Sequence, residues 1–101
     1  MKKESYRALK MFKALSNVVR YNIIQLLNFK EMDVGELSHT LNKTQANVSQ
    51  HLKILKDLDI VGYYTKAHNV VYYLSNKNIM GFIEVAEKFY IRNQAEKEEN
   101  I

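Results

Sequence analysis

Hydrophobic residues recur along most of the chain at the spacing of amphipathic helices. A first run, with one apolar residue in every three, predicts a helix over about 5–15. Residues 18–29 are so densely apolar that they predict a central, buried helix, in which Arg20 and Asn22 are the main polar positions. Between them, Ser16 and Asn17 break the pattern, and either can cap the second helix. The apolar positions of the first run are Tyr6, Leu9, Phe12 and Leu15.

Two further helices follow in close succession. Asp33 and Glu36 have the spacing of a capping box, so a short helix is expected to begin after a polar turn at 30–33 and to end at Leu41. Asn42 suits the left-handed conformation that ends helices. Thr44 is then a plausible N-cap for a helix that runs to Leu58. A short helix, a tight turn and a second helix form the helix-turn-helix pattern. The buried stripe of the second helix is Val48, Leu52, Leu55 and Leu58.

After Leu58 the pattern changes from helical to extended. Residues 60–66 and 70–74 are rich in β-forming side chains, and residues 67–69 between them predict a turn. In the second run, Val70, Tyr72 and Leu74 alternate onto one face. A hairpin directly after a helix-turn-helix is a wing. The predicted fold class is therefore mostly α with a small β-hairpin: a winged helix-turn-helix with four helices, two strands and a last helix.

The last helix, from about residue 76, is apolar on more than one side. A small domain cannot cover such a helix by itself, which predicts a dimer through the terminal helices. Residues 1–93 are expected to form one DNA-binding and dimerisation domain, and residues 94–101 a charged, frayed tail. The residues assigned to the dimer interface are Leu9, Phe12, Ile79, Phe82, Ile83, Ala86, Phe89 and Tyr90.

Composition narrows the classes of function. With 101 residues the chain forms one domain, and its net charge of +4 is compatible with nucleic acid without proving it. There is no cysteine, which excludes disulfides and thiolate metal sites on this chain. No apolar run reaches transmembrane length, so we expect a cytoplasmic protein with no membrane partner. No nucleophile–base pair or phosphate loop is evident, so we expect neither an enzyme nor a cofactor.

The helix after Thr44 carries the strongest functional signal. Its first two turns are polar but contain no charged residue, whereas a helix built only for solubility carries Glu and Lys along its length. Short neutral donors and acceptors near a helix N-terminus suit base edges in a major groove. An ordinary amphipathic helix is an equal alternative until the preceding helix and the wing are considered. The candidate DNA-binding residues are Thr44, Gln45, Ala46, Asn47, Ser49, Gln50, Lys53, and on the wing Lys66, His68 and Asn69.

The order of elements and three motifs resemble the ArsR/SmtB family of bacterial winged-helix repressors. The motifs are residues 12–17 with Arg20, residues 34–38 and residues 44–55. The resemblance implies a homodimer that binds a palindromic operator in double-stranded DNA and represses transcription until a signal releases it. By position, it places Gln45, Ala46, Ser49 and Gln50 against bases. His51 borders the apolar stripe, which favours a packed or phosphate-facing role.

The chain departs from the metal-sensing members of this family. Some of these use a Cys-x-Cys pattern, which a chain without cysteine cannot form. Others use acidic and histidine ligands on the last helix, where this chain has Asn76, Asn78, Phe89 and Arg92. Those side chains do not make a zinc site, so no metal ligand is assigned and the effector stays unknown.

Three alternatives stay open. A winged helix can act as a protein-interaction module without sequence-specific DNA binding. It can also bind RNA, although the neutral front of the helix after Thr44 argues against this. A metal-responsive repressor could build an atypical site from His39, His51 or His68, although these lie on three different predicted elements.

Overall fold

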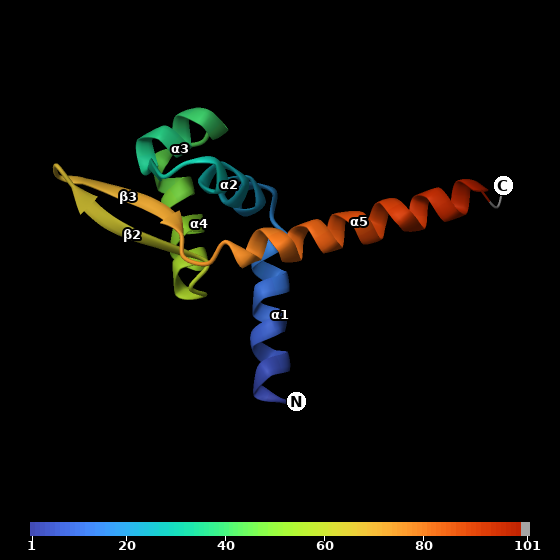
Figure 1. Ribbon diagram of the computed structural model, residues 1–101. Coiled ribbons are helices and arrows are strands. Elements are labelled where there is room, and N and C mark those ends of the chain that lie inside the picture. The colour runs from blue at the N-terminus through green and yellow to red at the C-terminus, as the bar shows by residue number, and fades with distance from the viewer. Residues whose placement is uncertain (100–101) are drawn as a thin grey trace.

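The computed structural model describes the backbone of residues 1–99 and the side chains of residues 1–89. Five helices and three short strands surround one core, with the β2–β3 wing and α5 projecting from opposite sides (Figure 1). The order of helices and strands agrees with the predicted winged helix-turn-helix. The elements are α1 (Lys3–Leu15), α2 (Val18–Phe29), β1 (Met32–Asp33), α3 (Val34–Leu41), α4 (Gln45–Asp57), β2 (Val61–Lys66), β3 (Asn69–Leu74) and α5 (Asn78–Glu99).

Short-range hydrogen bonds fix where the central helices begin. The Asn17 side chain caps α2, and Thr44 Oγ1 caps α4 by accepting from the backbone N–H of Asn47 at 3.0 Å. Asp33 and Glu36 form the predicted capping box of α3. Asn42 ends α3 in the left-handed conformation, with φ 54°. The predicted boundaries of the helix-turn-helix are thus confirmed.

The sheet has one strand more than predicted. Its order is β1-β3-β2, and all neighbours are antiparallel. Met32 and Asp33 were expected in a polar turn, but they pair with Tyr72 and Val71 and form the short edge strand β1. The prediction of a turn at these two positions is wrong, because the backbone of β3 offers hydrogen bonds to whatever segment lies beside it.

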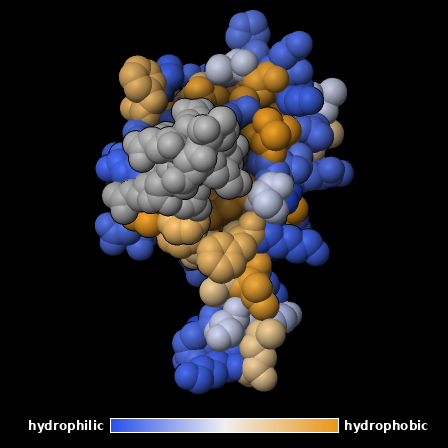
Figure 2. Space-filling view, turned by 90° about the vertical axis from the view of Figure 1, so that its right-hand side faces the viewer, coloured by the Kyte–Doolittle hydropathy of each residue, from blue (hydrophilic) through white to orange (hydrophobic). Residues whose placement is uncertain are grey.

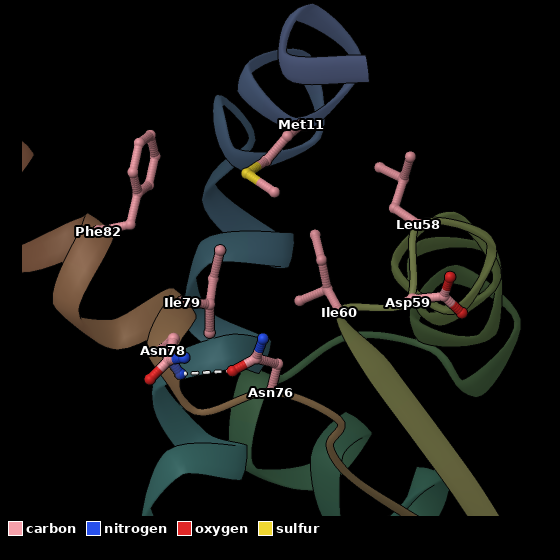
Figure 3. Close-up of a pocket in the computed structure, with 8 residues that line it drawn as sticks. All are labelled: Met11, Leu58, Asp59, Ile60, Asn76, Asn78, Ile79 and Phe82. Carbon is pink, nitrogen blue, oxygen red and sulfur yellow. Dashed lines mark hydrogen bonds between the residues drawn. The ribbon is translucent and has the colours of Figure 1, made fainter. Parts of the chain in front are cut away.

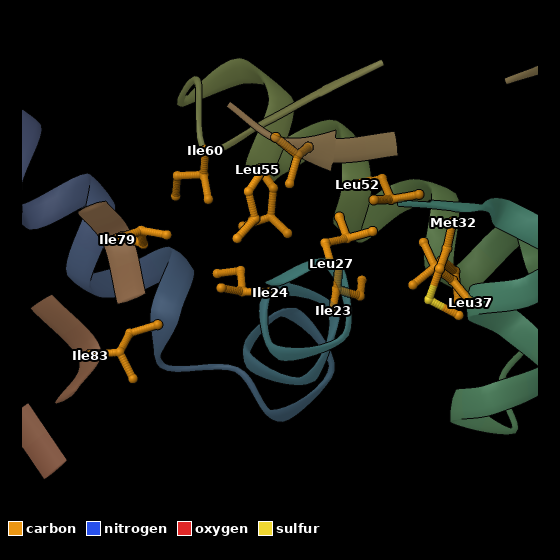
Figure 4. Close-up of a cluster of buried hydrophobic side chains, with 13 residues drawn as sticks. Ile23, Ile24, Leu27, Met32, Leu37, Leu52, Leu55, Ile60, Ile79 and Ile83 are labelled. Atoms are coloured by element: carbon orange, nitrogen blue, oxygen red, sulfur yellow. The ribbon is translucent and has the colours of Figure 1, made fainter. Parts of the chain in front are cut away.

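The core lies where α2, α3, α4 and the base of the wing meet (Figure 4). Val48, Leu52 and Leu55 of α4 are fully buried there, as their spacing predicted. Ile79 and Ile83 of α5 also join this core, with 7% and 3% of their surface exposed. Both were assigned to the dimer interface from the sequence. Their side chains instead attach α5 to the rest of this chain, so they leave the set of interface candidates.

The helix α5 is long enough to extend well beyond the core. Its backbone is helical from Asn78 to Glu99, past the boundary predicted after residue 93. The division into a domain and a tail stays a prediction. Tyr90, another predicted interface residue, lies outside the described side chains.

Candidate nucleic-acid interface

The first two turns of α4 present a neutral polar surface to solvent. Gln45, Ala46, Ser49 and Gln50 are all exposed, and so is the capping residue Thr44. The buried stripe of α4 faces α2 and α3, which leaves this opposite side free. The structure therefore brings the predicted base-facing residues together on one exposed surface, which we call the α4 front: Thr44, Gln45, Ala46, Ser49 and Gln50.

Asn47 differs from the other candidates on α4. It is half-buried, and its Oδ1 atom is enclosed without a hydrogen-bond partner among the described residues. Its backbone N–H is already used by the cap of Thr44. The enclosed oxygen cannot reach a base edge, which leaves only the amide NH₂ group of Asn47 available for such a contact.

The lysines of α4 lie behind the α4 front. Lys53 Nζ lies 3.2 Å from Asp57 Oδ2 in an exposed i,i+4 pair, which contributes little to stability. The Lys56 ammonium lies over the ring of Tyr63 in β2, 5.3 Å from the ring centre. Lys56 therefore connects α4 to the wing, while Lys53 keeps its ammonium group exposed.

The wing ends in a tighter turn than expected. Lys66 pairs with Asn69, so the loop has only two residues, Ala67 and His68, both with positive φ (49° and 67°). Such a turn matches the twist of the strands, although it normally favours Asn and Gly. All three predicted wing contacts, Lys66, His68 and Asn69, are exposed at the tip.

A second contact holds the wing against the loop before β1. The hydroxyl of Tyr64 donates to Glu31 Oε1 at 2.6 Å, joining β2 to the loop before β1. This hydrogen bond to the carboxylate raises the pKa of Tyr64, because it favours the protonated phenol. No pattern in the sequence predicts this pair, since the two residues are 33 positions apart.

Arg20 joins three helices at the base of α4. Its Nε donates to the carbonyl of Ala14 at 2.7 Å, and its Nη1 lies 3.0 Å from Nδ1 of His51. Burial lowers the pKa of the His51 imidazole, and the positive charges of Arg20 and Lys43 lower it further. His51 thus takes the packed role that its place beside the apolar stripe indicated.

A separate apolar surface follows α1 and α5, away from the α4 front. The rings of Phe12 and Phe82 stack with centres 5.7 Å apart, and both are about half exposed. Figure 2 shows apolar side chains along the projecting α1 and around its junction with α5. We call this surface the α1/α5 face. It is defined by the exposed large apolar residues of the two helices: Tyr6, Leu9, Phe12, Phe82, Val85 and Phe89.

Beside this face lies a hollow of about 380 Å³ between α1, the α4–β2 turn and the start of α5 (Figure 3). Met11, Ile79 and Phe82 give it apolar walls, and Asp59 stands at its edge. The amide oxygen of Asn76 accepts from the backbone N–H of Asn78 at 2.9 Å and caps α5. The hollow adjoins the α1/α5 face through Phe82, which belongs to both.

Metal-ligating side chains do not gather in the described part of the chain. Among side chains 1–89, no three His, Asp or Glu residues are close enough to hold one ion. His39 lies on α3, His51 on α4 and His68 at the tip of the wing.

Within residues 1–99, no helix has both the length and the apolarity needed to cross a membrane.

Comparison with known proteins identifies the family. Residues 17–63 match the family described as bacterial regulatory protein, arsR family. The transcriptional activator HlyU of Vibrio cholerae is 36% identical over 90 residues, which cover 89% of this chain and 83% of that protein. This chain belongs to the ArsR family. The family resemblance inferred from the α4 motif is thereby confirmed, and the protein is a transcriptional regulator rather than an enzyme.

Other relatives agree on the fold and differ in regulatory direction. The transcriptional repressor SdpR of Bacillus subtilis is 30% identical over 70 residues, covering 69% of this ArsR-family chain and 77% of that protein. The structure of Vibrio cholerae HlyU superposes with a TM-score of 0.76 at 35% identity, over 90% of this chain and 99% of that one. At 17% identity, a Mycobacterium bovis domain described as a homodimeric winged helix-turn-helix shares the fold, with a TM-score of 0.77 over 92% and 93% of the two chains.

Proposed function

We propose that this regulator is a homodimer that binds a two-fold symmetric DNA operator and represses transcription. The observation that carries the proposal is the pairing of two unlike exposed surfaces on one small domain. The α4 front carries short polar side chains, which suit base edges in a major groove, and the α1/α5 face exposes large apolar side chains, which suit the buried centre of a subunit contact.

In this proposal the α4 front enters the major groove and the wing follows the DNA backbone. Gln45 and Ser49 read base edges, because their short polar side chains are exposed in the first two turns of α4. Lys53 and Lys66 contact phosphates, which attracts DNA of any sequence. His68 and Asn69 lie at the wing tip, within reach of phosphate or the minor groove.

Selection of genomic fragments by the purified protein tests the proposal directly. The recovered fragments should share a two-fold symmetric site, whose half-sites are about one helical turn, roughly 34 Å, apart. Recovery of fragments without a common site would instead favour a protein-interaction module. On such a site, Gln45→Ala and Ser49→Ala should each cost about 1–3 kcal/mol, with little loss on random DNA.

Two lysine variants test whether the wing contributes charge attraction to DNA. Lys66→Ala should weaken binding to operator and random DNA alike and flatten the salt dependence. Lys77→Ala is the matched control, since it removes the same charge from an exposed position at the start of α5. Equal effects of the two lysine changes would remove the wing from the interface.

The dimer is tested on the α1/α5 face. Phe89→Glu should lower the mass measured by sedimentation at micromolar concentration, because it puts a charge where two apolar surfaces are expected to meet. Phe29→Glu is the matched control, since Phe29 is also an exposed phenylalanine but lies at the end of α2 beside α3. A wild-type protein that sediments as a monomer would contradict the dimer.

Repression is the finer part of the proposal. The named relatives include an activator and a repressor, so family membership leaves the direction open. A protein of this size that covers a promoter excludes polymerase from it by occupying the same DNA. Transcription in vitro from a template that carries the selected site should fall when the protein is added, and a rise would reverse the assignment.

A further inference from the structure

Arg20 is a half-buried residue of α2 whose side chain makes hydrogen bonds to other helices. Its guanidinium reaches two other helices: Nε donates to the Ala14 carbonyl at 2.7 Å, Nη2 to the Lys13 carbonyl at 3.4 Å, and Nη1 to His51 Nδ1 at 3.0 Å. A guanidinium has five N–H groups in a rigid planar fork, so one side chain can hold several acceptors in fixed directions.

The two carbonyls belong to the last turn of α1, where backbone acceptors have no partner within the helix. A cation there is also favoured by the helix dipole. The third acceptor, His51, lies on α4 directly after Gln50 of the α4 front. One side chain therefore joins the end of α1, which carries part of the exposed apolar face, to the helix that carries the polar front.

The direction of the third hydrogen bond fixes the state of His51. Arginine can only donate, so Nδ1 of His51 must accept, and the imidazole is neutral with its proton on Nε2. The charged groups that face this ring are Arg20 from α2 and Lys43 from the turn before α4. From α1 the guanidinium receives the carbonyls of Lys13 and Ala14. Lys10, Lys13 and Asp57 line a hollow beside Arg20.

We propose that Arg20 is a positioning residue for sequence reading: through neutral His51 it fixes the placement of α4 relative to α1. This inference rests on the proposed function. If two protomers meet through α1 and α5, the angle between α1 and α4 sets where the two α4 fronts lie on the DNA. An operator requires that placement, whereas random DNA, bound through its phosphates, does not.

The junction is also sensitive to acid. When Nδ1 of His51 takes a proton, Arg20 loses its acceptor and faces a second cation. Because burial and neighbouring cations lower the pKa of His51, the folded protein keeps the ring neutral at pH values where the unfolded chain is already protonated. The contact is complete above about pH 6.5, the ordinary value for histidine, and is lost only as the pH falls through the lowered pKa of His51 in the folded protein.

The test measures affinity for operator and for random DNA side by side, and the readout is their ratio. Arg20→Lys keeps the charge but loses the fork, and His51→Leu removes the acceptor. Each should lower the ratio by about tenfold, while affinity for random DNA stays within about twofold. His51→Asn is the matched control, because its amide oxygen can accept from Arg20 near the place of Nδ1 and does not titrate.

The pH profile gives a second readout, which a merely structural role would not move. Between about pH 7.5 and about pH 5 the wild-type ratio should fall, while random binding holds or strengthens with the added charge. His51→Asn should keep a high ratio across that range. A ratio in His51→Asn that falls as in the wild type would trace the acid response to another group and overturn the junction's role.

The outcomes separate this inference from the proposed function. A wild-type protein without any preferred site would sink the proposed function first. A wild-type preference that survives both Arg20→Lys and His51→Leu within about twofold would overturn the positioning role alone. If thermal melting shows that Arg20→Lys does not fold, His51→Leu decides the question by itself, since it leaves the bonds to Ala14 and Lys13 in place.

Discussion

At the scale of single residues, three polar side chains begin the three helices that form the centre of the fold. Asn17, Asp33 and Thr44 each accept a hydrogen bond from the backbone three residues further on, at 3.1, 2.8 and 3.0 Å. Such caps satisfy amides that the helix leaves unpaired. Thr44 matters most for the proposed function, because it caps α4 and is also part of the α4 front.

Replacing Thr44 by alanine should lower the free energy of unfolding by about 1 kcal/mol, because the Asn47 amide would lose its partner. Thr44→Ser is the matched control, since it keeps the hydroxyl and should stay within about 0.5 kcal/mol of the wild type. Denaturation in urea measures both. A serine variant as unstable as the alanine variant would show that the methyl group matters, and not the cap.

Local hydrogen bonds of this kind can be predicted from the sequence, and those across the fold cannot. A cap joins residues three apart, so the spacing of Asp33 and Glu36 was enough to identify it. Arg20 and His51 are 31 positions apart, and nothing in the sequence pairs them. The one available signal was an arginine at the start of an otherwise apolar helix, because a buried cation needs partners.

At the scale of whole elements, the wing shows where pattern and local conformation disagree. The strands followed from their β-forming residues and from the alternation of Val70, Tyr72 and Leu74. The turn was predicted at residues 67–69, but its two-residue form was not, because Ala67 and His68 have left-handed conformations that do not follow from the sequence. The edge strand β1 is two residues long, too short for any periodicity to predict it.

Replacing Ala67 by Asn and His68 by Gly should therefore stabilise the protein, by about 1 kcal/mol for the pair. Asn-Gly is the sequence that such a two-residue turn prefers, and it would relieve the strain at both positions. Urea denaturation measures the gain, and the reversed pair Gly-Asn is a useful comparison. No gain in stability would indicate that the wing opens independently of the core.

The same double variant also tests the role of the wing tip. It removes the His68 side chain while preserving the hairpin, so it separates stability from DNA contact. Operator affinity should fall by about twofold to threefold if His68 contacts a phosphate. Unchanged affinity in a more stable variant would leave Lys66 and Asn69 as the only contacts at the tip.

At the scale of the whole molecule, long stripes of side chains were predictable and their division between core and surface was not. The stripe on α5 was recognised, but Ile79 and Ile83 pack into the core of the chain while Phe82 and Phe89 stay exposed. Periodicity places residues on one side of a helix, and it does not say which neighbour covers them. The residues that cover Ile79 and Ile83 belong to the core formed by α2 and α4, which are far away in the sequence.

The arrangement of the whole molecule also decides whether it can bind a metal, as the metal-sensing members of the ArsR/SmtB family do. The family's last-helix ligand positions near the start of α5 hold Asn76 and Asn78, and the Asn76 oxygen is occupied as a cap. His51 is held by Arg20, and His39 and His68 lie on other elements. Zinc prefers tetrahedral sets of nitrogen and sulfur ligands, which these side chains do not assemble within one protomer.

Low micromolar zinc should therefore leave operator affinity within about twofold, a change near 0.4 kcal/mol. Release of DNA requires a ligand that binds one state of the protein better than the other, and a metal without a tight site makes no such difference. Fluorescence anisotropy of the protein–operator complex during a zinc titration measures this. Stoichiometric release that disappears in His39→Ala or His68→Ala would place a site between two protomers, since within one protomer these histidines lie on separate elements.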